Sequence, residues 1–337
     1  MMIQRLKGFY SAVSKLQPQI NGIRCMSSLL TKSDAQERRN EAFNNEKKRQ
    51  RAAVGRIEKV TVTYQGNGEE IKLLMNKELS TPYDCARHIT EGVATTSALA
   101  SVNGVPWDMH RPLVSDCELK LFTMRTPDRS VNNAFWRTCS LMLGAVVDSA
   151  FKDNITCHLH SFTSPNIKSG SFLYDVYLDL PNWSPTLAEM KSLSGLFSQL
   201  CEKKLPIERL EVDTGYALDM FQDNPYKTQQ IPNIAKFNEN KIVLYRIGKH
   251  IDISKGPMIC HTGIVGRCTI NGIHKIKNDA GETLYRFQGI ALPKGIILNH
   301  FIYSVLEKRS EKLNQTVWMP QRMEPESEQS ISIAAKN

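Results

Sequence analysis

The stretch "YRIGKHIDISKGPMICHTG", residues 245–263, combines a strand, a tight turn at Gly256 and Pro257, and a second short strand. A loop of this kind, held between regular elements, is where proteins commonly place binding and catalytic groups. The turn itself offers Ser254, Lys255 and Met258, which are poor at binding a metal or moving a proton. The stretch therefore has the setting of a reactive site without the reactive groups.

The composition of the whole chain indicates a globular protein with anionic partners. Its 337 residues suffice for two domains with their own cores, and 41% hydrophobic and 23% charged residues are usual for globular proteins. The longest apolar runs fall far short of a membrane span of roughly 18 residues. An excess of 43 Lys and Arg over 34 Asp and Glu favours nucleic acid as a partner. The eight cysteines form no C-x-x-C pair, which indicates reduced thiols rather than disulfides or a zinc ribbon.

The N-terminal residues 1–30 predict a mitochondrial presequence. They are basic and rich in hydroxyl groups, the first acid of the chain is Asp34, and a long apolar segment is missing. We expect cleavage between Cys25 and Asp34 and a location in the mitochondrial matrix. The alternative is a disordered basic tail.

Residues 31–56 predict a basic helical extension. They are good helix formers with few apolar residues beyond Phe43, and a helix that is polar all round is either solvated or lies on a charged partner. Its clustered basic residues are candidates for phosphate contacts. These RNA-binding candidates are Arg38, Arg39, Lys47, Lys48, Arg49 and Arg51. The alternative is a run of charges facing water.

Residues 57–125 predict a β-grasp module. Residues 57–64 alternate like a strand, 65–70 form a turn, and 71–75 return as a second strand. A helix follows, with Thr81 as cap, Pro82 in the first turn and Gly92 as the stop. "ALASVNG" and "CELKLFT" supply two further strands, which completes the order β-β-α-β…β.

Residues 126–310 predict a second, α+β domain after a hinge at 126–135. Apolar residues at three- and four-residue steps in 132–153 indicate an amphipathic helix, and Ser184 with Pro185 opens another. Strands are expected at 172–180, 207–212 and 241–248, a hairpin at 273–292 turned by residues 278–281, and a helix over 295–309. The polar tail, 311–337, is expected to be disordered.

Several stretches carry a resemblance to a known family. Residues 57–125 resemble a TGS domain, and the remainder resembles the second N-terminal, editing-type domain of threonyl-tRNA and alanyl-tRNA synthetases. The stretches, in the family's order, are "STPYDCARHI", "FWRTCSLMLGAVVDSAF", "FLYDVYLDL", "LPIERLEV", "NPYKTQQI", "LYRIGKHIDISKGPMICHTG" and "LYRFQGIAL". The resemblance implies a β-grasp domain followed by an α+β editing-like domain.

The residues that carry catalysis in that family are replaced here. The family's long helix carries H-x-x-x-H, whose histidines share one helix face; those positions hold Arg137 and Leu141. The family's Cys and His in a D-x-C-x-G-P-H setting are Ser254 and Met258. Leucine and methionine cannot activate water, arginine stays protonated, and an unassisted serine is a poor base. The resemblance implies a vestigial editing site without catalytic residues, in which Arg137 could pair with an acid such as Asp252 or face RNA.

A rebuilt metal site is an alternative that the sequence leaves open. It would draw on Cys157, His158, His160, Cys260 and His261. Residues 158 and 160 share one strand face while 157 points away, so structural or exposed roles are favoured. We expect no metal, no cofactor and no small-molecule substrate, since nothing resembles a nucleotide-binding loop.

The departures from the synthetase pattern resemble those of the mitochondrial large-ribosomal-subunit protein thirty-nine family, which keeps a synthetase-derived N-terminal half without an aminoacylation domain. The resemblance implies a structural constituent that contacts ribosomal RNA and neighbouring proteins. One alternative is a stand-alone enzyme that deacylates mischarged tRNA with a relocated site. Another is a TGS-based regulatory module that binds RNA or a nucleotide.

Overall fold

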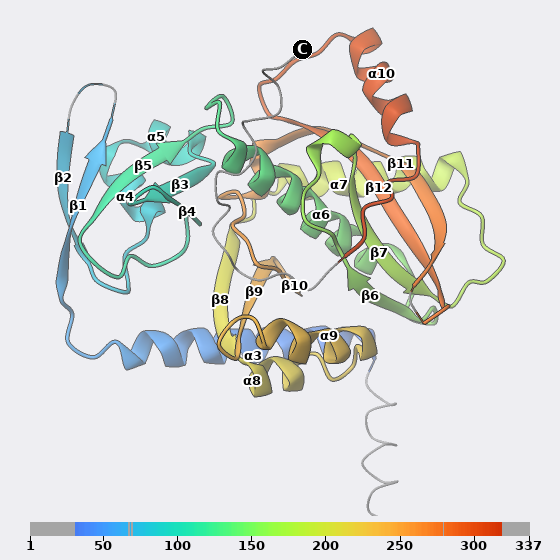
Figure 1. Ribbon diagram of the computed structural model, residues 1–337, viewed down its shortest axis with the longest axis horizontal. Helices are drawn as coiled ribbons and strands as arrows, with labels where there is room; N and C mark the ends of the chain where they lie inside the picture. Colours follow the sequence, from blue (N-terminus) through green and yellow to red (C-terminus); the bar gives the residue numbers. More distant parts are fainter. Residues whose placement is uncertain (1–30, 67, 69, 279, 319–337) are drawn as a thin grey trace, which may run out of the picture.

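The computed structural model describes residues 31–66, 68, 70–278 and 280–318. The expected presequence, 1–30, lies outside these residues, as does most of the expected tail. Two α+β domains lie side by side, and the first described helix passes beneath the second of them (Figure 1).

The first domain is a five-stranded sheet in the order β2-β1-β5-β3-β4. The central pair, β1 and β5, is parallel, while β1–β2 and β3–β5 are antiparallel. The expected β-grasp order is thus confirmed. The elements are β1 (Lys59–Gln65), β2 (Glu70–Asn76), α4 (Pro82–Ile89), α5 (Glu91–Thr96), β3 (Leu99–Val102), β4 (Val105–Trp107) and β5 (Cys117–Phe122).

The helix of this domain begins as the sequence predicts and ends earlier. Thr81 and Asp84 form a capping box, with Pro82 in the first turn. Helix α4 stops at Ile89 rather than at Gly92, because Thr90 adopts an extended backbone and its side chain caps α5.

The second domain is built on a four-stranded antiparallel sheet in the order β11-β12-β7-β6. The long helix α6 crosses it so closely that a Cβ on Gly144 would lie 2.6 Å from the ring of Tyr174. Helices α7 and α10 contact β11. The elements are α6 (Arg129–Ala150), β6 (Cys157–Ser161), η1 (Ile167–Ser169), β7 (Phe172–Leu178), α7 (Leu187–Glu202), η2 (Thr262–Ile264), β11 (Val265–Lys277), β12 (Thr283–Pro293) and α10 (His300–Ser310).

Three boundaries in this domain correct the sequence predictions. Helix α6 already begins at Arg129, within the expected hinge, because Asp128 caps it. Helix α7 is capped by Thr186, whose capping box with Glu189 replaces the expected cap at Ser184. Helix α10 begins at His300, after the Asn299 cap, rather than at residue 295.

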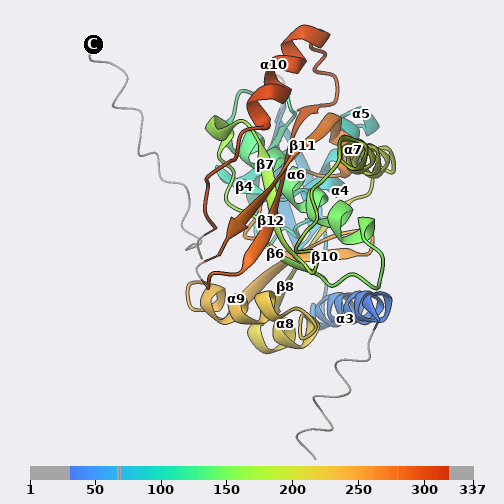
Figure 2. The same ribbon diagram turned by 90° about the vertical axis from the view of Figure 1, so that its right-hand side faces the viewer.

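A second core lies on a three-stranded sheet in the order β10-β9-β8. Figure 2 shows α3 beside α8 and α9 at this end of the molecule. Phe43, the apolar residue in the middle of α3, is fully buried there among residues of β8, β9 and α8. The elements are α3 (Lys32–Ala53), β8 (Ile207–Asp213), α8 (Thr214–Met220), α9 (Pro225–Ala235), β9 (Lys241–Ile247) and β10 (His250–Ile253).

The first part of the expected tail is ordered, which corrects its predicted start at 311. Asn314 is buried, its backbone N–H donates to Gln288 Oε1, and its side-chain amide donates to the Ser171 carbonyl at 3.1 Å. Its backbone carbonyl accepts from Arg286. Buried backbone groups need such partners, and here the sheet supplies them.

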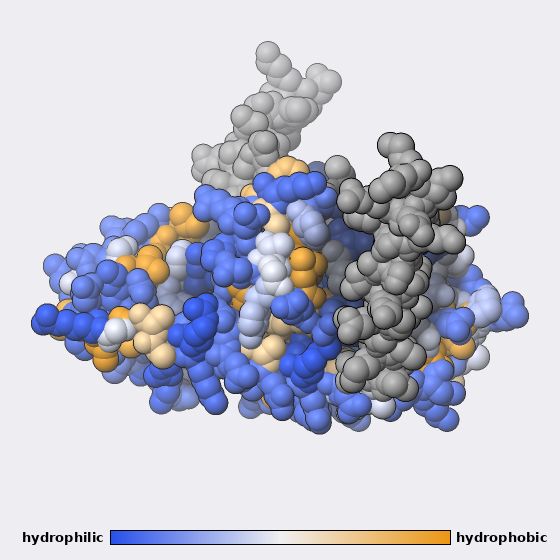
Figure 3. Space-filling model, turned by 90° about the horizontal axis from the view of Figure 1, so that it is seen from below, coloured by the Kyte–Doolittle hydropathy of each residue, from blue (hydrophilic) through white to orange (hydrophobic). Residues whose placement is uncertain are grey.

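No helix in the described ranges has the length and apolarity to cross a membrane. Seen from the side of α3, α8 and α9, the surface is mainly hydrophilic, with apolar residues in separate patches (Figure 3).

Candidate functional site

The expected vestigial site lies where α6 meets the loop after β10. Arg137 donates to the Pro257 carbonyl at 3.0 Å, and the Thr138 hydroxyl is 3.5 Å from the Met258 sulfur. The backbone N–H of Ile259 donates to the Thr138 hydroxyl at 3.0 Å. The two segments that the sequence predicts to converge are therefore packed directly against each other.

The side chains at the vestigial positions fill the core. Leu141 and Met258 are 0% and 1% exposed and belong to the main hydrophobic cluster. Arg137 is 4% exposed, so it does not face RNA from the surface. Ser254 is half-buried at the edge, where its hydroxyl accepts from the Gly256 N–H at 3.3 Å. Close-packed interiors leave little room for water, and Leu141 and Met258 are packed in this way.

The carboxylate of Asp252, the first residue of the vestigial D-x-C-x-G-P-H setting, is neutralised inside the protein. Asp252 forms a buried ion pair with Lys227 at 2.5 Å and accepts a hydrogen bond from the Tyr174 hydroxyl. Burial, followed by the charge of Asp252, raises the pKa of Tyr174 well above its ordinary value. Asp252 therefore already has a cation of its own and serves the packing of α9 against β10.

Gly256 allows the loop to approach β9. Its φ is +67°, and a Cβ there would lie 1.8 Å from the Tyr245 hydroxyl. Only glycine fits a position with a left-handed backbone and so little space.

The same tyrosine joins the two domains. Its hydroxyl donates to Asp108 of the first domain at 2.9 Å, and the Met258 N–H donates to the same carboxylate at 2.7 Å. Arg209 lies 3.7 Å from it. Burial, followed by the charge of Asp108, raises the pKa of Tyr245 well above its ordinary value, so it stays a donor. Asp108, which no sequence pattern singled out, is thus the polar centre of the domain interface.

The residues of the alternative metal site lie in two different environments. His158 and His160 on β6 pack with the rings of Tyr177 and Tyr226. Cys260 instead faces His110 of the first domain, with Sγ and Nε2 3.5 Å apart. Within the part of the chain that the structure describes, no group of three or more His, Cys, Asp or Glu residues is arranged to hold a metal ion.

The basic extension lies on the second domain, and part of its charge is used there. Arg38 and Arg39 reach Asp223 at 3.2 and 2.6 Å, and the Arg39 guanidinium also lies over the Phe221 ring. For Arg38 and Arg39, the charged partner of the helix is therefore the second domain of the same chain.

In the C-terminal half of α3, some basic residues form ion pairs and others do not. Lys47 pairs with Glu208 at 2.5 Å, and Arg49 pairs with Glu46 within the helix at 2.7 Å. Two of the expected RNA-binding residues are exposed and have no ion pair with the described residues; these are Lys48 and Arg51. RNA binding by this helix stays a prediction.

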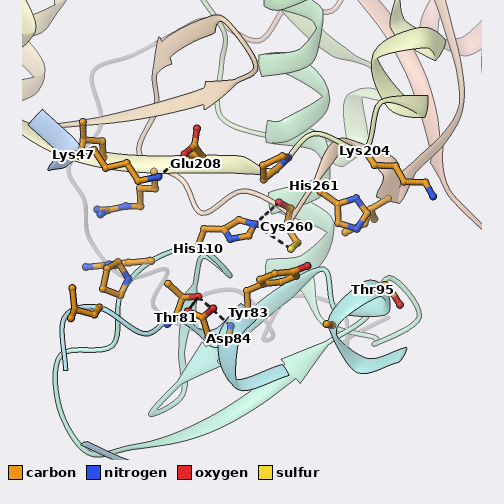
Figure 4. A pocket seen from close by; sticks show the side chains of 18 of the residues that line it. Lys47, Thr81, Tyr83, Asp84, Thr95, His110, Lys204, Glu208, Cys260 and His261 are labelled. Atoms are coloured by element: carbon orange, nitrogen blue, oxygen red, sulfur yellow. Dashed lines mark hydrogen bonds and ion pairs between the residues drawn. The ribbon is translucent and has the colours of Figure 1, made fainter. Parts of the chain in front are cut away.

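A large cleft of about 1640 Å³ opens between the two domains and the end of α3. Figure 4 shows His110, Tyr83 and Cys260 at its centre, with Lys47 and Lys204 toward the two ends. His110 Nε2 lies 3.1 Å from the Cys260 carbonyl oxygen. Burial raises the pKa of the Cys260 thiol to about 12, and burial lowers the pKa of His110, so both are neutral at pH 7. This pair lacks the thiolate of a nucleophile.

The cleft is the feature that sequence reasoning missed. Its cationic wall comes from segments far apart in the chain, and no local pattern joins them. The basic residues that line it are Lys47, Arg51, Arg111, Arg125, Lys204, Arg209 and Lys294.

Comparison with known proteins identifies the first domain and finds relatives that match across both domains. The TGS domain family matches residues 61–123. The large ribosomal subunit protein mL39 of Drosophila melanogaster is 46% identical over 297 residues, which cover 87% of this chain and 89% of that protein. The cytoplasmic threonine–tRNA ligase 1 of Homo sapiens is 31% identical over 222 residues, 64% of this chain and 28% of the ligase. The mitochondrial threonine–tRNA ligase of Rattus norvegicus is 29% identical over 225 residues and matched over 30% of its length. The match to the ligases is therefore confined to less than a third of each enzyme.

Proposed function

We propose, from the premise that this chain belongs to the large ribosomal subunit protein mL39 family, that it is a structural constituent of the mitochondrial large ribosomal subunit. In this role it supports mitochondrial translation by binding ribosomal RNA and neighbouring ribosomal proteins. The match of the chain to part of a threonine–tRNA ligase, together with its TGS domain, supports a role as a docking body, since a fold can serve a new function without its former catalytic residues.

The observation that carries the proposal is the filled vestigial site. Leu141 and Met258 are buried where the resemblance places catalytic histidines, and the nearby Asp252 is paired with Lys227. Deacylation needs a group that positions or deprotonates water, with a pKa near the working pH. The packed apolar side chains supply neither the group nor the space, which supports a role in binding rather than catalysis.

Two measurements test this proposal. On a density gradient of mitochondrial lysate at native salt, the protein is expected to sediment with the large subunit. Recovery only as a free protein would contradict the structural role.

In the second measurement, the purified full chain is incubated with a mischarged aminoacyl-tRNA. The ester is expected to hydrolyse at the rate seen in buffer, for the wild type and for the Arg137→His, Leu141→His variant alike. Hydrolysis by the wild type well above the buffer rate would instead favour the stand-alone editing enzyme.

A further inference from the structure

The cleft between the two domains has a surplus of positive charge that the protein itself does not neutralise. Two of its four acidic residues are ion-paired: Glu208 binds both Lys47 and Arg246 at 2.5 Å, and Glu211 binds Arg209 at 2.9 Å. The other two are Asp84, which accepts a hydrogen bond from Thr81, and Glu78. Five lining cations form no ion pair with the described residues; these are Arg51, Arg111, Arg125, Lys204 and Lys294.

One of these unpaired cations, Arg111, is held in place by an aromatic ring. Arg111 stacks on Trp107, with its Cζ 3.6 Å from the ring centroid. Burial, and then the positive charge of Arg209, lower the pKa of Arg111. Asp108 and Glu211 act on this pKa in the opposite direction. Guanidinium groups stay charged in proteins, so the Arg111 charge is available to an anion in the cleft.

Flat rings accompany the cations. The rings of Tyr83 and His110 lie 5.0 Å apart, and both side chains line the cleft with partial exposure. His261 lines the same wall from the other domain. Surfaces that combine backbone-binding cations with aromatic rings are typical of proteins that bind single-stranded nucleic acid.

The size of the cleft argues against a small metabolite. Pockets for small molecules measure about 300–1,000 Å³, whereas this cleft has about 1640 Å³. An occupant of several nucleotides matches that space better than one nucleotide does. An acidic peptide would satisfy the cations but would not use the rings.

We propose that this cleft holds a single-stranded or looped segment of ribosomal RNA, with phosphates against Arg51, Arg125, Lys204 and Lys294 and a base against Tyr83 and His110. This inference rests on the proposed function and assigns the RNA contact to a specific site. On this proposal, the main contact with RNA lies between the two domains rather than along the face of α3 whose cations pair with the second domain.

The electrostatic part is tested with the full chain and a fluorescent 15-nucleotide oligouridine. Lys204 and Lys294 are exposed, so Lys204→Glu, Lys294→Glu leaves the fold intact. The matched control is Lys191→Glu, Lys236→Glu, which makes the same charge change at exposed positions outside the cleft. The cleft variant is expected to bind at least about 10-fold more weakly, and to lose roughly 1.4 from the slope of log affinity against log salt, since each single-strand phosphate contact contributes about 0.7. The control is expected to stay within about threefold of wild type.

The stacking part is tested at Tyr83. Tyr83→Leu is expected to weaken oligouridine binding about fivefold or more, whereas Tyr83→Phe keeps the ring and the affinity. Equal losses in both variants would remove the stacking role. A polyglutamate peptide of 15 residues is added as a competitor. If it displaces the RNA at equal charge concentration, the cleft is an acidic-peptide site and the inference is overturned.

The inference and the proposed function fail in different ways. If the cleft variant binds oligouridine like the control, the inference is wrong while co-sedimentation of the wild type can still stand. If the wild type does not sediment with the large subunit, the proposed function fails whatever the cleft variant does.

Discussion

The vestigial site and the interdomain cleft share one loop, residues 254–264, but the two sides of this loop have opposite characters. On the side of α6, Met258 is buried in the main hydrophobic core. On the other side, Cys260 and His261 border an open, cationic cleft. Catalysis needs a few reactive groups in one place, whereas docking needs surface and charge. The comparison shows a packed apolar region and an open cationic surface on the two sides of one loop.

The largest effect is expected where the loop supports both sides. In Gly256→Ala, the new Cβ would lie 1.8 Å from the Tyr245 hydroxyl at a φ of +67°. The clash and the strained backbone together should lower the free energy of unfolding by about 3 kcal/mol or more, or prevent folding. Denaturant titration measures the change. The control Gly281→Ala also has a positive φ but meets no atom within 4 Å, and should cost only about 1 kcal/mol. Equal effects would mean that the loop is not pressed against β9.

A polar substitution separates the filled side from the open side. Leu141→His puts an imidazole without a hydrogen-bond partner into a site that is 0% exposed, and should lower the free energy of unfolding by about 2–4 kcal/mol. The same change at Val114, which lines the cleft and is 52% exposed, should stay within about 0.5 kcal/mol. Thermal or denaturant unfolding gives both values. A neutral Leu141→His variant would show that the old site is hollow.

A smaller effect is expected at the hydrogen bonds that connect the two domains. Tyr245→Phe removes the hydroxyl that donates to Asp108 at 2.9 Å. Bonds to charged groups contribute about 1.5–3 kcal/mol, and the Met258 N–H remains as a partner, so a loss of about 1.5 kcal/mol is expected. In the control Tyr177→Phe, no hydroxyl hydrogen bond between described residues is removed, and the change should be under about 0.5 kcal/mol. Unfolding monitored by denaturant reads out both variants; a Tyr245→Phe protein as stable as wild type would show that this bond does not hold the domains together.

Local sequence signals predicted the elements well, because their causes are local. The helix cap at Thr81 and the hairpin over 273–292 were predicted from neighbouring residues and are confirmed. Resemblance, rather than composition or periodicity, led to Arg137, Leu141 and Met258, and the structure brings α6 and their loop together. Whether this site is filled or empty could not be decided from the sequence, because burial depends on how the two segments pack.

The features that sequence reasoning missed depend on distant contacts. Arg39 looked like a free cation, but Asp223, its partner, lies 184 residues later. No sequence pattern pointed to Lys204 or Lys294, since only folding brings both residues to the lining of the cleft. Charge clusters in a sequence report density, whereas binding surfaces depend on which charges remain unpaired after folding.

The position of α3 has a consequence for the order of assembly. The helix precedes both domains in the chain, yet Phe43 packs among residues 210–251, and Lys47 binds Glu208, which lies 161 residues later. An isolated polar helix is only marginally stable in water. During synthesis or import, α3 can therefore dock only once residues 208–251 have folded. The first described segment of the chain thus depends for its place on a partner that follows 161 residues later.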